Sequence, residues 1–389
     1  MADPLSYIRE DEALAILLAL VRAGGVNPPG ETANVIRELA EHLDADGIPY
    51  EVLPARPRVD SLVATLAGQR PGKTLLLNGH VDVVPPGANW TMDPFVGVFR
   101  DGRVYGRGAC DMKAGVAAML LAQLALRRAG APFAGHLVFT AVADEETGGE
   151  LGTRFLLQRG LKADYAVIGE PSNLRVELGN RGLAWFRIAV RGKAGHPGRP
   201  ATGVNAVAYA GKLVSAIADM KFSGRNELFE VPTPSITVTM IQGGVKANVI
   251  PDDCVVTCDR RLLPGETTGG ALAELESVIA DLPQPGITAT VSTLHAMEAY
   301  VVSQDEPVVR ALAGAHARVL GAPPQYGAKG GGTDGSFLYH EGGIPTVLYG
   351  PGNVELAHTA DEYVDLAGVV AAAKVYTLLA LDLLAVDQG

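Results

Sequence analysis

Two adjacent acidic residues, Glu145 and Glu146, follow an apolar run that extends from Leu137 to Ala143. Adjacent carboxylates repel one another, and the end of a strand is an unusual place for them unless a cation binds there. A divalent metal would turn this repulsion into binding, because one carboxylate could hold the metal while its neighbour takes a proton from water on that metal. For an isolated pair a solvated acidic turn is the simpler explanation, so the other ligand-type residues decide between the two interpretations.

His80 and Asp82 follow a second apolar run, residues 73–78, and stand two residues apart. On extended backbone both side chains project to the same side. A neutral imidazole is a common zinc ligand, and a carboxylate on its other nitrogen fixes the tautomer. A hydrogen-bonded histidine at a turn is the alternative for this pair.

Three further side chains complete a candidate ligand set. Asp111 opens an Ala/Leu-rich helical stretch, where its carboxylate could cap the helix or bridge two metals. Glu170 ends a buried apolar strand and needs a cationic partner, and His358 follows a Gly/Pro loop. One Asp, two Glu and two His would give each of two metals a His, a Glu and the shared Asp. Nitrogen and oxygen ligands without thiolate favour Zn²⁺, with Co²⁺ or Mn²⁺ tolerated.

The elements that must position these residues alternate between helices and short apolar strands. Strands are expected at 61–67, 73–80, 135–143 and 165–169, and helices within 10–44, which is broken at 24–30, and at 112–129 and 154–158. This alternation predicts an α/β fold with helices on both faces of a sheet.

Between residues 178 and 295 the order changes to strand, helix, two strands, helix and strand. The segments are 183–191, 204–220, 235–241, 249–261, 267–282 and 287–294. This βαββαβ order predicts an inserted α+β domain with a ferredoxin-like fold. Helix and strand alternation resumes near Glu306, so we expect a discontinuous α/β/α catalytic domain made of residues 1–177 and 296–389 around the insert 178–295.

The composition limits the class of protein. The chain has 389 residues with 48% hydrophobic and 19% charged residues, and its net charge of −11 argues against a nucleic-acid partner. Three cysteines do not form a disulfide framework, and the sequence shows neither a signal peptide nor an apolar run of membrane-spanning length. We therefore expect a cytoplasmic protein without a membrane partner.

In order and spacing, the five motifs resemble the co-catalytic zinc aminoacylase, acetylornithine deacetylase, succinyl-diaminopimelate desuccinylase and carboxypeptidase G family. The similarity covers nearly the whole chain and consists of Gly-His80-Val-Asp82, Cys-Asp111-Met-Lys, Asp-Glu145-Glu146-Thr-Gly-Gly, Gly-Glu170-Pro-Ser and Ala-His358-Thr-Ala-Asp-Glu. It implies a zinc-peptidase-like catalytic domain. The implied roles are one zinc on His80 and Glu170, a second on Glu146 and His358, a bridge at Asp111, orientation of His80 by Asp82, and a general base at Glu145.

The resemblance also implies that the inserted domain is a lid that forms a homodimer. His196 of that domain would reach the active site of the partner subunit and stabilise an oxyanion. Asn248 and Arg261 would bind the substrate, with Arg261 binding the substrate carboxylate. Whether Arg261 or its neighbour Arg260 has this role stays open. A glycine loop with Gly332 and Thr333 would lie on the substrate side.

These residues predict a metal-dependent hydrolase that cleaves the amide of an N-acyl amino acid by zinc-bound hydroxide, with Glu145 as the general base. A dipeptidase, aminopeptidase or carboxypeptidase that acts on small peptides would use the same metal core. A catalytically inactive binding homologue is the alternative from another class, and the intact Glu145 and five ligands argue against it. The sequence leaves the acyl group and the amino acid open.

Overall fold

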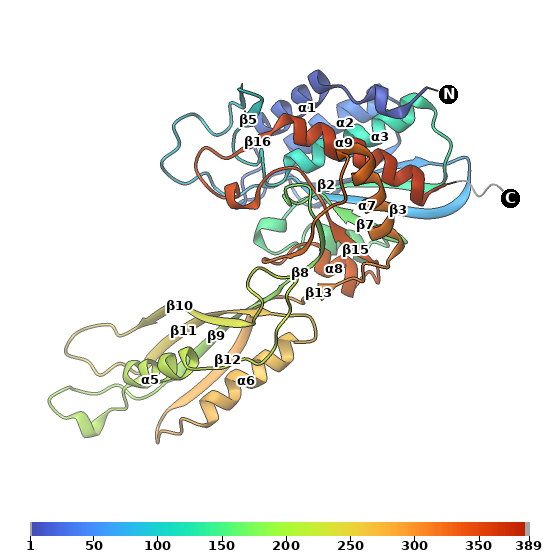
Figure 1. Cartoon of the computed structure of the whole chain (residues 1–389). Helices are drawn as coiled ribbons and strands as arrows, with labels where there is room; N and C mark the ends of the chain where they lie inside the picture. Colours follow the sequence, from blue (N-terminus) through green and yellow to red (C-terminus); the bar gives the residue numbers. More distant parts are fainter. Residues whose placement is uncertain (1, 386–389) are drawn as a thin grey trace. The chain divides into compact units, whose positions relative to one another are not determined.

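The computed structural model describes residues 2–385 and divides into two compact units. The first comprises Met1–Gly179, Val302–Ala328 and Phe337–Gly389, and the second comprises Asn180–Val301 and Lys329–Ser336. Figure 1 labels their helices and strands in chain order. The segment 329–336, which we expected in the catalytic domain, packs with the second unit.

A mixed sheet forms the centre of the first unit, with the order β1-β2-β6-β3-β7-β15-β8 and β14 also paired with β8. β3 is parallel to both β6 and β7, and β15 is parallel to β7. The carboxyl ends of these strands therefore meet at one edge, where ligand sites of α/β sheets lie. The bounds are Tyr50–Arg56 for β1, Val59–Ala67 for β2, Arg70–His80 for β3, Ala134–Val142 for β6, Tyr165–Ile168 for β7, Val176–Asn180 for β8, Tyr326–Lys329 for β14 and Thr346–Leu348 for β15.

Helices cover this sheet and confirm the expected α/β fold class. The helix α3 (Lys113–Ala129) packs on β3, β6, α1 and α9 and is buried over its whole length as far as Leu126. Such an all-buried helix needs an apolar sequence on every side, which explains its Ala/Leu-rich composition. The other helices are α1 (Glu10–Arg22), α2 (Ala33–Ala45), α4 (Thr153–Gln158), α7 (Pro307–Leu320), α8 (Gly335–His340) and α9 (Leu366–Leu383).

By length and composition alone, α9 could cross a membrane, and it is the one helix among residues 2–385 that meets this test. The expectation that the chain has no apolar run of that length is therefore wrong. Half of the apolar window is buried inside the protein, where α9 packs on α3 and α7. Burial among other helices gives the physical reason for its apolar sequence.

A three-stranded sheet with the order β16-β5-β4 lies beside the ligand loops and was not predicted from the sequence. Its strands are only three residues each, Val98–Arg100 for β4, Arg103–Tyr105 for β5 and Tyr363–Asp365 for β16. It joins the chain just before Asp111 to the chain just after His358. The small sheet thus fixes two ligand segments that are far apart in sequence.

The second unit has the expected βαββαβ order and an antiparallel sheet with the order β10-β11-β9-β12. Its elements are β9 (Gly182–Arg191), α5 (Ala206–Ala218), β10 (Ser235–Gly243), β11 (Asp253–Leu262), α6 (Thr268–Ala280) and β12 (Thr288–Met297). Both helices pack on one face of this sheet, and alternate residues of β9 and β11 fill the core between them. Cys254 and Cys258 lie in that core.

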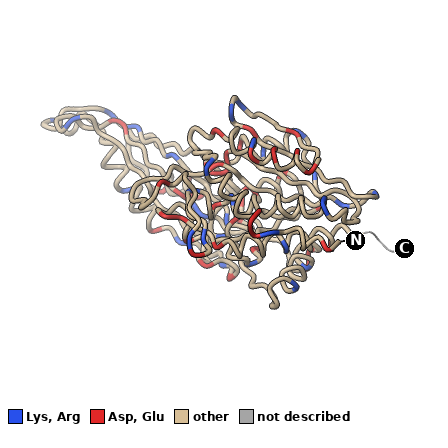
Figure 2. The backbone as a smooth tube through the Cα atoms, turned by 90° about the horizontal axis from the view of Figure 1, so that it is seen from above, with Lys and Arg blue, Asp and Glu red and all other residues tan. Residues whose placement is uncertain are grey.

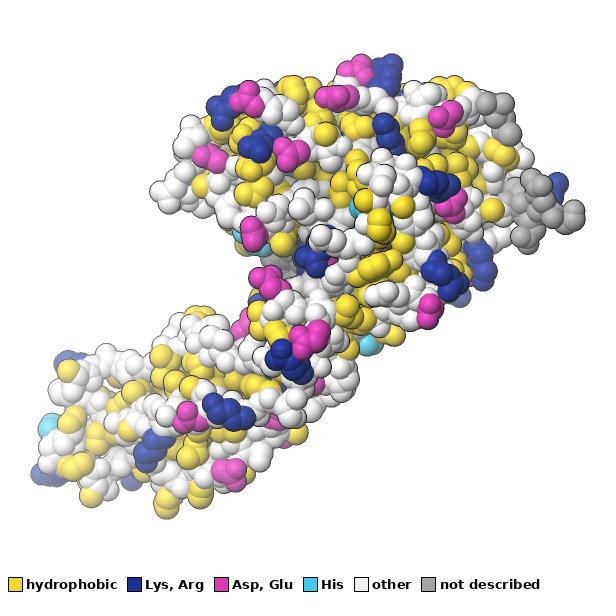
Figure 3. All heavy atoms as spheres, in the orientation of Figure 1, with side chains coloured by type: hydrophobic (Ala, Val, Ile, Leu, Met, Phe, Trp, Pro, Cys, Tyr) yellow, Lys and Arg dark blue, Asp and Glu magenta, His cyan; other side chains and the backbone are white. Residues whose placement is uncertain are grey.

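Charged residues of both signs are interspersed along the chain (Figure 2) and over the one face drawn in the space-filling view (Figure 3). A protein that binds nucleic acid carries its Lys and Arg side chains in a patch or stripe. The mixed pattern agrees with the negative net charge of −11.

Candidate metal centre

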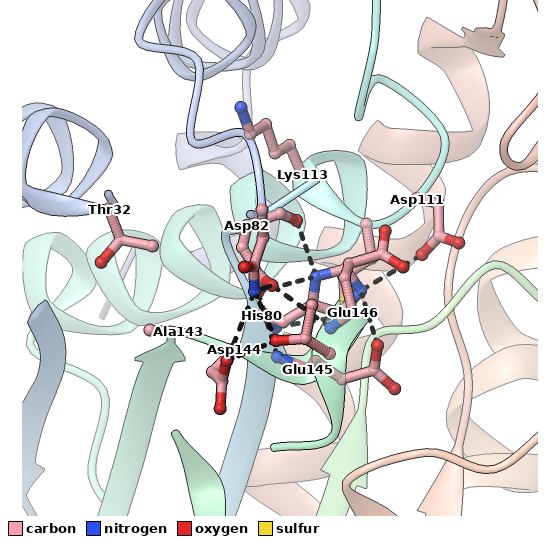
Figure 4. A network of polar contacts seen from close by, with 12 residues as sticks. Thr32, His80, Asp82, Asp111, Lys113, Ala143, Asp144, Glu145 and Glu146 are labelled. Carbon is pink, nitrogen blue, oxygen red and sulfur yellow. Dashed lines mark hydrogen bonds and ion pairs between the residues drawn. The ribbon is translucent and has the colours of Figure 1, made fainter. Parts of the chain in front are cut away.

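The five candidate ligands converge at the edge where the parallel strands of the first unit end. Figure 4 shows three of them, His80, Asp111 and Glu146. His80 is the last residue of β3, and Glu170 comes two residues after β7. Glu146 lies in the short 3₁₀ turn η2 (Glu145–Thr147) that follows β6. Asp111 comes two residues before α3, and His358 follows the 3₁₀ turn η4 (Val354–Leu356).

The five side chains form two groups that share Asp111. In the first group the Nε2 atom of His80 is 3.2 Å from Oδ1 of Asp111 and 3.6 Å from Oε1 of Glu170. In the second, the Nε2 atom of His358 is 3.5 Å from Oδ2 of Asp111 and 3.1 Å from Oε2 of Glu146. The two oxygens of Asp111 therefore face different histidines, which is the arrangement that a bridging carboxylate requires.

Asp82 orients His80 through its backbone rather than through its carboxylate. The Nδ1 atom of His80 is 2.9 Å from the carbonyl oxygen of Asp82, whereas the nearest carboxylate oxygen is 3.6 Å away. A carbonyl oxygen only accepts, so Nδ1 carries the proton and Nε2 presents its lone pair to the ligand group. The Asp82 carboxylate instead accepts the backbone N–H groups of Glu145 and Glu146, each at 3.2 Å.

The neighbours Glu145 and Glu146 occupy different environments, and neither is a solvated turn residue. Their side chains are only 12% and 6% exposed, respectively. Glu146 belongs to the second ligand group, whereas Glu145 belongs to neither group and lies 3.9 Å from Nε2 of His80. The geometry therefore separates a ligand position from a position beside the ligands.

The charges of the site call for a cation. Burial raises the pKa of Glu146, and the nearby Asp111 carboxylate adds to this effect although His358 opposes it. Burial would lower the pKa of His80, but the carboxylates around it, chiefly Asp111 and Asp82, raise it well above its usual value. Contact with Glu146 raises the pKa of His358 as well. A divalent cation would take the place of such protons, which would be released to solvent, so the donor set fits a pair of divalent ions.

Glu362 and Arg107 hold the Asp111 loop, and the sequence analysis assigned neither a role. The carboxylate of Glu362 accepts the backbone N–H groups of Gly108, Cys110 and Asp111 and pairs with Nη1 of Arg107 at 2.6 Å. Asp111 does not cap α3, because the N-cap residue of α3 is Met112. The sequence signal that could have indicated a role for Glu362 is its place at the end of the His358 motif, four residues after that ligand.

The second unit carries the remaining predicted residues. His196 and Asn248 are exposed on loops. The backbone N–H of Gly198 donates to Nδ1 of His196 at 3.0 Å. Since Nδ1 accepts, the neutral ring carries its proton on Nε2, where it can donate to an oxyanion.

The register of the two arginines follows from the pleat of β11. Arg260 points to the helix-covered face, where it is 1% exposed and pairs with Glu266 at 2.6 Å and Glu274 at 3.2 Å. Arg261 points to the open face, and its Nε and Nη2 atoms donate to Asp259 at 2.7 and 3.0 Å. The Nη1 edge of Arg261 faces away from this pair, so Arg261 rather than Arg260 can take a further carboxylate.

The glycine loop lies on the same open face. A side chain at Gly332 would begin 2.9 Å from Cδ2 of Leu183 and from Sδ of Met297, so the loop approaches the sheet this closely only with glycine there. Leu183 pairs with Arg261 across the strands β9 and β11. Thr333 is buried, and its hydroxyl donates to Oδ1 of Asn180 at 2.9 Å. The loop thus lies against Leu183, the strand partner of Arg261, while the Thr333 hydroxyl is engaged within the unit.

Arg181, at the start of β9, is a further candidate that the sequence analysis missed. It is 4% exposed and donates to backbone carbonyls, the best of them that of Thr233 at 2.8 Å. Its Nε atom has no hydrogen-bond partner among the described residues, and no carboxylate within residues 2–385 forms an ion pair with it. Burial and the charge of Arg261 lower the pKa of Arg181. A buried guanidinium of this kind favours an anion nearby.

This acidic and imidazole cluster at the edge of an α/β sheet is a candidate metal centre, and comparison with known proteins identifies the family. Residues 76–382 match Peptidase family M20/M25/M40, and the chain belongs to that family. A succinyl-diaminopimelate desuccinylase from Wolinella succinogenes is 32% identical over 315 residues, 78% of this chain and 83% of the relative. An acetylornithine deacetylase from Myxococcus xanthus is 33% identical over 318 residues, 80% of each chain. The family resemblance expected from the sequence is confirmed.

Solved structures confirm the fold. A tripeptidase from Staphylococcus aureus superimposes with a TM-score of 0.78 at 24% identity, over 96% of this chain and 99% of its own. A Bacillus subtilis protein described as a dinuclear metal binding peptidase of the M20 family gives a TM-score of 0.73 at 18% identity, over 96% of this chain and 98% of its own. The protein is thus a hydrolase of the M20 family with candidate metal sites.

Proposed function

We propose that this protein hydrolyses the amide bond of an N-acyl amino acid, as an acetylornithine deacetylase or succinyl-diaminopimelate desuccinylase does. The observation that carries the proposal is the position of Glu145. Its carboxylate is nearly buried, lies 3.9 Å from Nε2 of His80 and belongs to neither ligand group. A carboxylate beside a ligand cluster but outside it is placed for proton transfer.

Two Zn²⁺ ions would occupy the two ligand groups, with Co²⁺ or Mn²⁺ as substitutes. His80, Asp111 and Glu170 would hold one ion, and Asp111, Glu146 and His358 the other. When bound, the metal pair would supply Lewis-acid polarisation of the amide carbonyl and of the attacking water. The mixed nitrogen and oxygen donor set supports zinc.

Glu145 takes the proton of the attacking water on its carboxylate and returns it to the leaving amine. Asp82 holds the backbone of Glu145 in place, and Glu362 holds that of Asp111. In a homodimer formed through the second unit, His196 of the partner subunit donates from Nε2 to the developing oxyanion. The hydrogen bond from Gly198 to Nδ1 supports this proton position.

Arg261 selects a substrate with a free carboxylate, using the Nη1 edge that its pair with Asp259 leaves exposed. The buried Arg181 adds positive charge near Arg261, and burial together with the charge of Arg261 lowers the pKa of Arg181, so a further anion would be favourable there. Asn248 and the loop of Gly332 and Thr333 complete the substrate side. The fold comparisons support the second candidate, hydrolysis of a dipeptide or short peptide, because the similar solved structures include named peptidases.

The test is a substrate panel assayed for amine release by the zinc-loaded protein. It contains N-acetyl, N-succinyl, N-formyl and N-carbamoyl amino acids and free dipeptides, each beside its C-terminal carboxamide. We expect cleavage of an N-acyl amino acid and a higher KM for the carboxamide. Preferential cleavage of dipeptides would establish the peptidase instead. A complete lack of turnover, with two zinc ions bound, would leave the inactive binding homologue.

A further inference from the structure

The segment between α1 and α2 contains none of the proposed ligands, yet it touches the loops that carry them. Val26 forms a parallel bridge with Val83, and the backbone N–H of Asn27 donates to the carbonyl of Val83 at 2.8 Å. Lys113, two residues after Asp111, donates from Nζ to the carbonyls of Leu20, at 2.8 Å, and Gly24. In Figure 4 the Lys113 side chain is directed away from the acidic group. The segment is therefore tied to the ends of both ligand loops.

Asn27 extends this connection to the turn that carries Glu145 and Glu146. Its side chain is buried, with the residue 3% exposed. The Nδ2 group faces three acceptors, Oδ2 of Asp82 at 2.8 Å, Oγ1 of Thr147 at 3.0 Å and Oδ1 of Asp144 at 3.4 Å. Asn27 is thus a neutral donor placed between two buried carboxylates, which lowers their mutual repulsion and satisfies both.

Asp82 transmits this constraint to the turn. Its Oδ1 accepts the backbone N–H of Glu145 and its Oδ2 that of Glu146, while Oδ2 is also the atom that Asn27 contacts. Asp144 begins the turn in the left-handed region, with φ 70°, and its side chain accepts the backbone N–H of Leu151 at 3.0 Å. Asn27 thereby contacts both residues that fix the backbone of the turn.

We propose that Asn27 is a positioning residue that sets the carboxylate of Glu145 beside the ligand groups by acting through Asp82. The inference rests on the proposed function for the role of Glu145, but the contacts themselves do not depend on it. Asn27 is in neither ligand group, so its removal should leave metal binding intact while the turn loosens. A residue that serves packing alone would lower stability throughout the first unit instead.

The first arm of the test measures the turn directly, by hydrogen exchange of the zinc-loaded protein. The variants are Asn27→Ala and Asn27→Asp, which replaces the donor by a third carboxylate, with the exposed Asn34→Ala on α2 as a matched control. We expect the amides of Glu145 and Glu146 to exchange at least about tenfold faster in both Asn27 variants, because local opening governs protection. Peptides from β1 and α9 should not change, and neither should the control. Unchanged exchange at the turn, or faster exchange everywhere, would overturn the proposal.

The second arm measures zinc content and kinetics on the best substrate of the panel. We expect two bound zinc ions, a KM within about threefold of wild type and a kcat lower by about 10- to 100-fold, the range that a small misplacement of a catalytic group produces. In a Glu145→Gln background, Asn27→Ala should cost nothing further, because residues that act as one unit are not additive. Full additivity, or loss of zinc, would contradict the assignment. If wild type cleaves no substrate, the proposed function has failed and the exchange arm alone decides on Asn27.

Discussion

Exchanging the two neighbouring glutamates separately tests the division of labour at the site. Glu145→Gln keeps the size of the side chain and the backbone N–H bond to Asp82, so it removes only the proton acceptor. We expect kcat to fall about 10²–10⁴-fold, the range for a general base, which at about 1.36 kcal/mol per tenfold is about 3–5 kcal/mol of the barrier. Both zinc ions should remain bound.

Glu146→Gln removes a charged oxygen from a group of three ligands, in which its nearest partner is His358 at 3.1 Å. The first ligand group is untouched, so we expect zinc content to fall from two ions to one after dialysis. The assay combines metal analysis after gel filtration with steady-state kinetics at saturating added zinc. A Glu145→Gln variant that keeps more than a tenth of wild-type kcat, or a Glu146→Gln variant that keeps two ions, would refute this account of the pair.

Further predictions concern the second unit. Arg261→Ala should raise KM for carboxylate substrates and leave the thermal midpoint nearly unchanged. Arg260→Ala should destabilise by about 1–3 kcal/mol, because it removes a buried guanidinium from two partly exposed carboxylate partners, Glu266 and Glu274. The reverse pattern in paired melting and kinetic measurements would show that the register is wrong. Burial raises the pKa of the Cys258 thiol to about 11 from 9.0. The folded protein then binds more protons than the unfolded chain between these values, so the free energy of unfolding should fall as pH rises from 9 toward 11. Chemical denaturation across this range should show a smaller fall in Cys258→Val, and an equal fall would exclude the thiol as the cause. The native protein should resist iodoacetamide at pH 8.5 because all three cysteines are buried, and labelling before unfolding would contradict this.

Three members of the ligand cluster, His80, Glu146 and Glu170, could be predicted because they stand at the ends of apolar strands. Strand ends in a parallel sheet converge, so a motif after each strand places its side chain at a common edge. Short segments with distant partners could not be found in this way. The strands β4, β5 and β16 have three residues each, and β5 pairs with β16 from the far end of the chain, a partner that local sequence does not reveal.

Arg261 and Asn27 differ in whether the sequence carries a signal for their position. The spacing of Cys254 and Cys258 puts both on one face of a strand, and the same period of two puts Arg260 on that face and Arg261 on the other. The register could therefore have been derived from the sequence. Asn27 stands in a Gly/Pro-rich break that predicts only a turn, and its role depends on Asp82, 55 positions away. The lid homodimer and the cytoplasmic location stay predictions.

The last prediction concerns Arg181, whose buried charge should add nothing to stability but should help to bind a carboxylate substrate. Its guanidinium is buried and forms no ion pair with a carboxylate among residues 2–385. Its shortest hydrogen bond is the one to the carbonyl of Thr233. Arg181→Met fills similar space and removes a desolvated charge, so we expect the free energy of unfolding to change by no more than about 1 kcal/mol and in favour of the variant if at all. The KM for carboxylate substrates should rise, while that for their carboxamides should not. A strong loss of stability with unchanged KM would mean that Arg181 only supports the strand start. A higher KM for carboxylate substrates alone, with stability unchanged or higher, would mean that the chain keeps an unpaired buried charge because its substrate supplies the counter-ion.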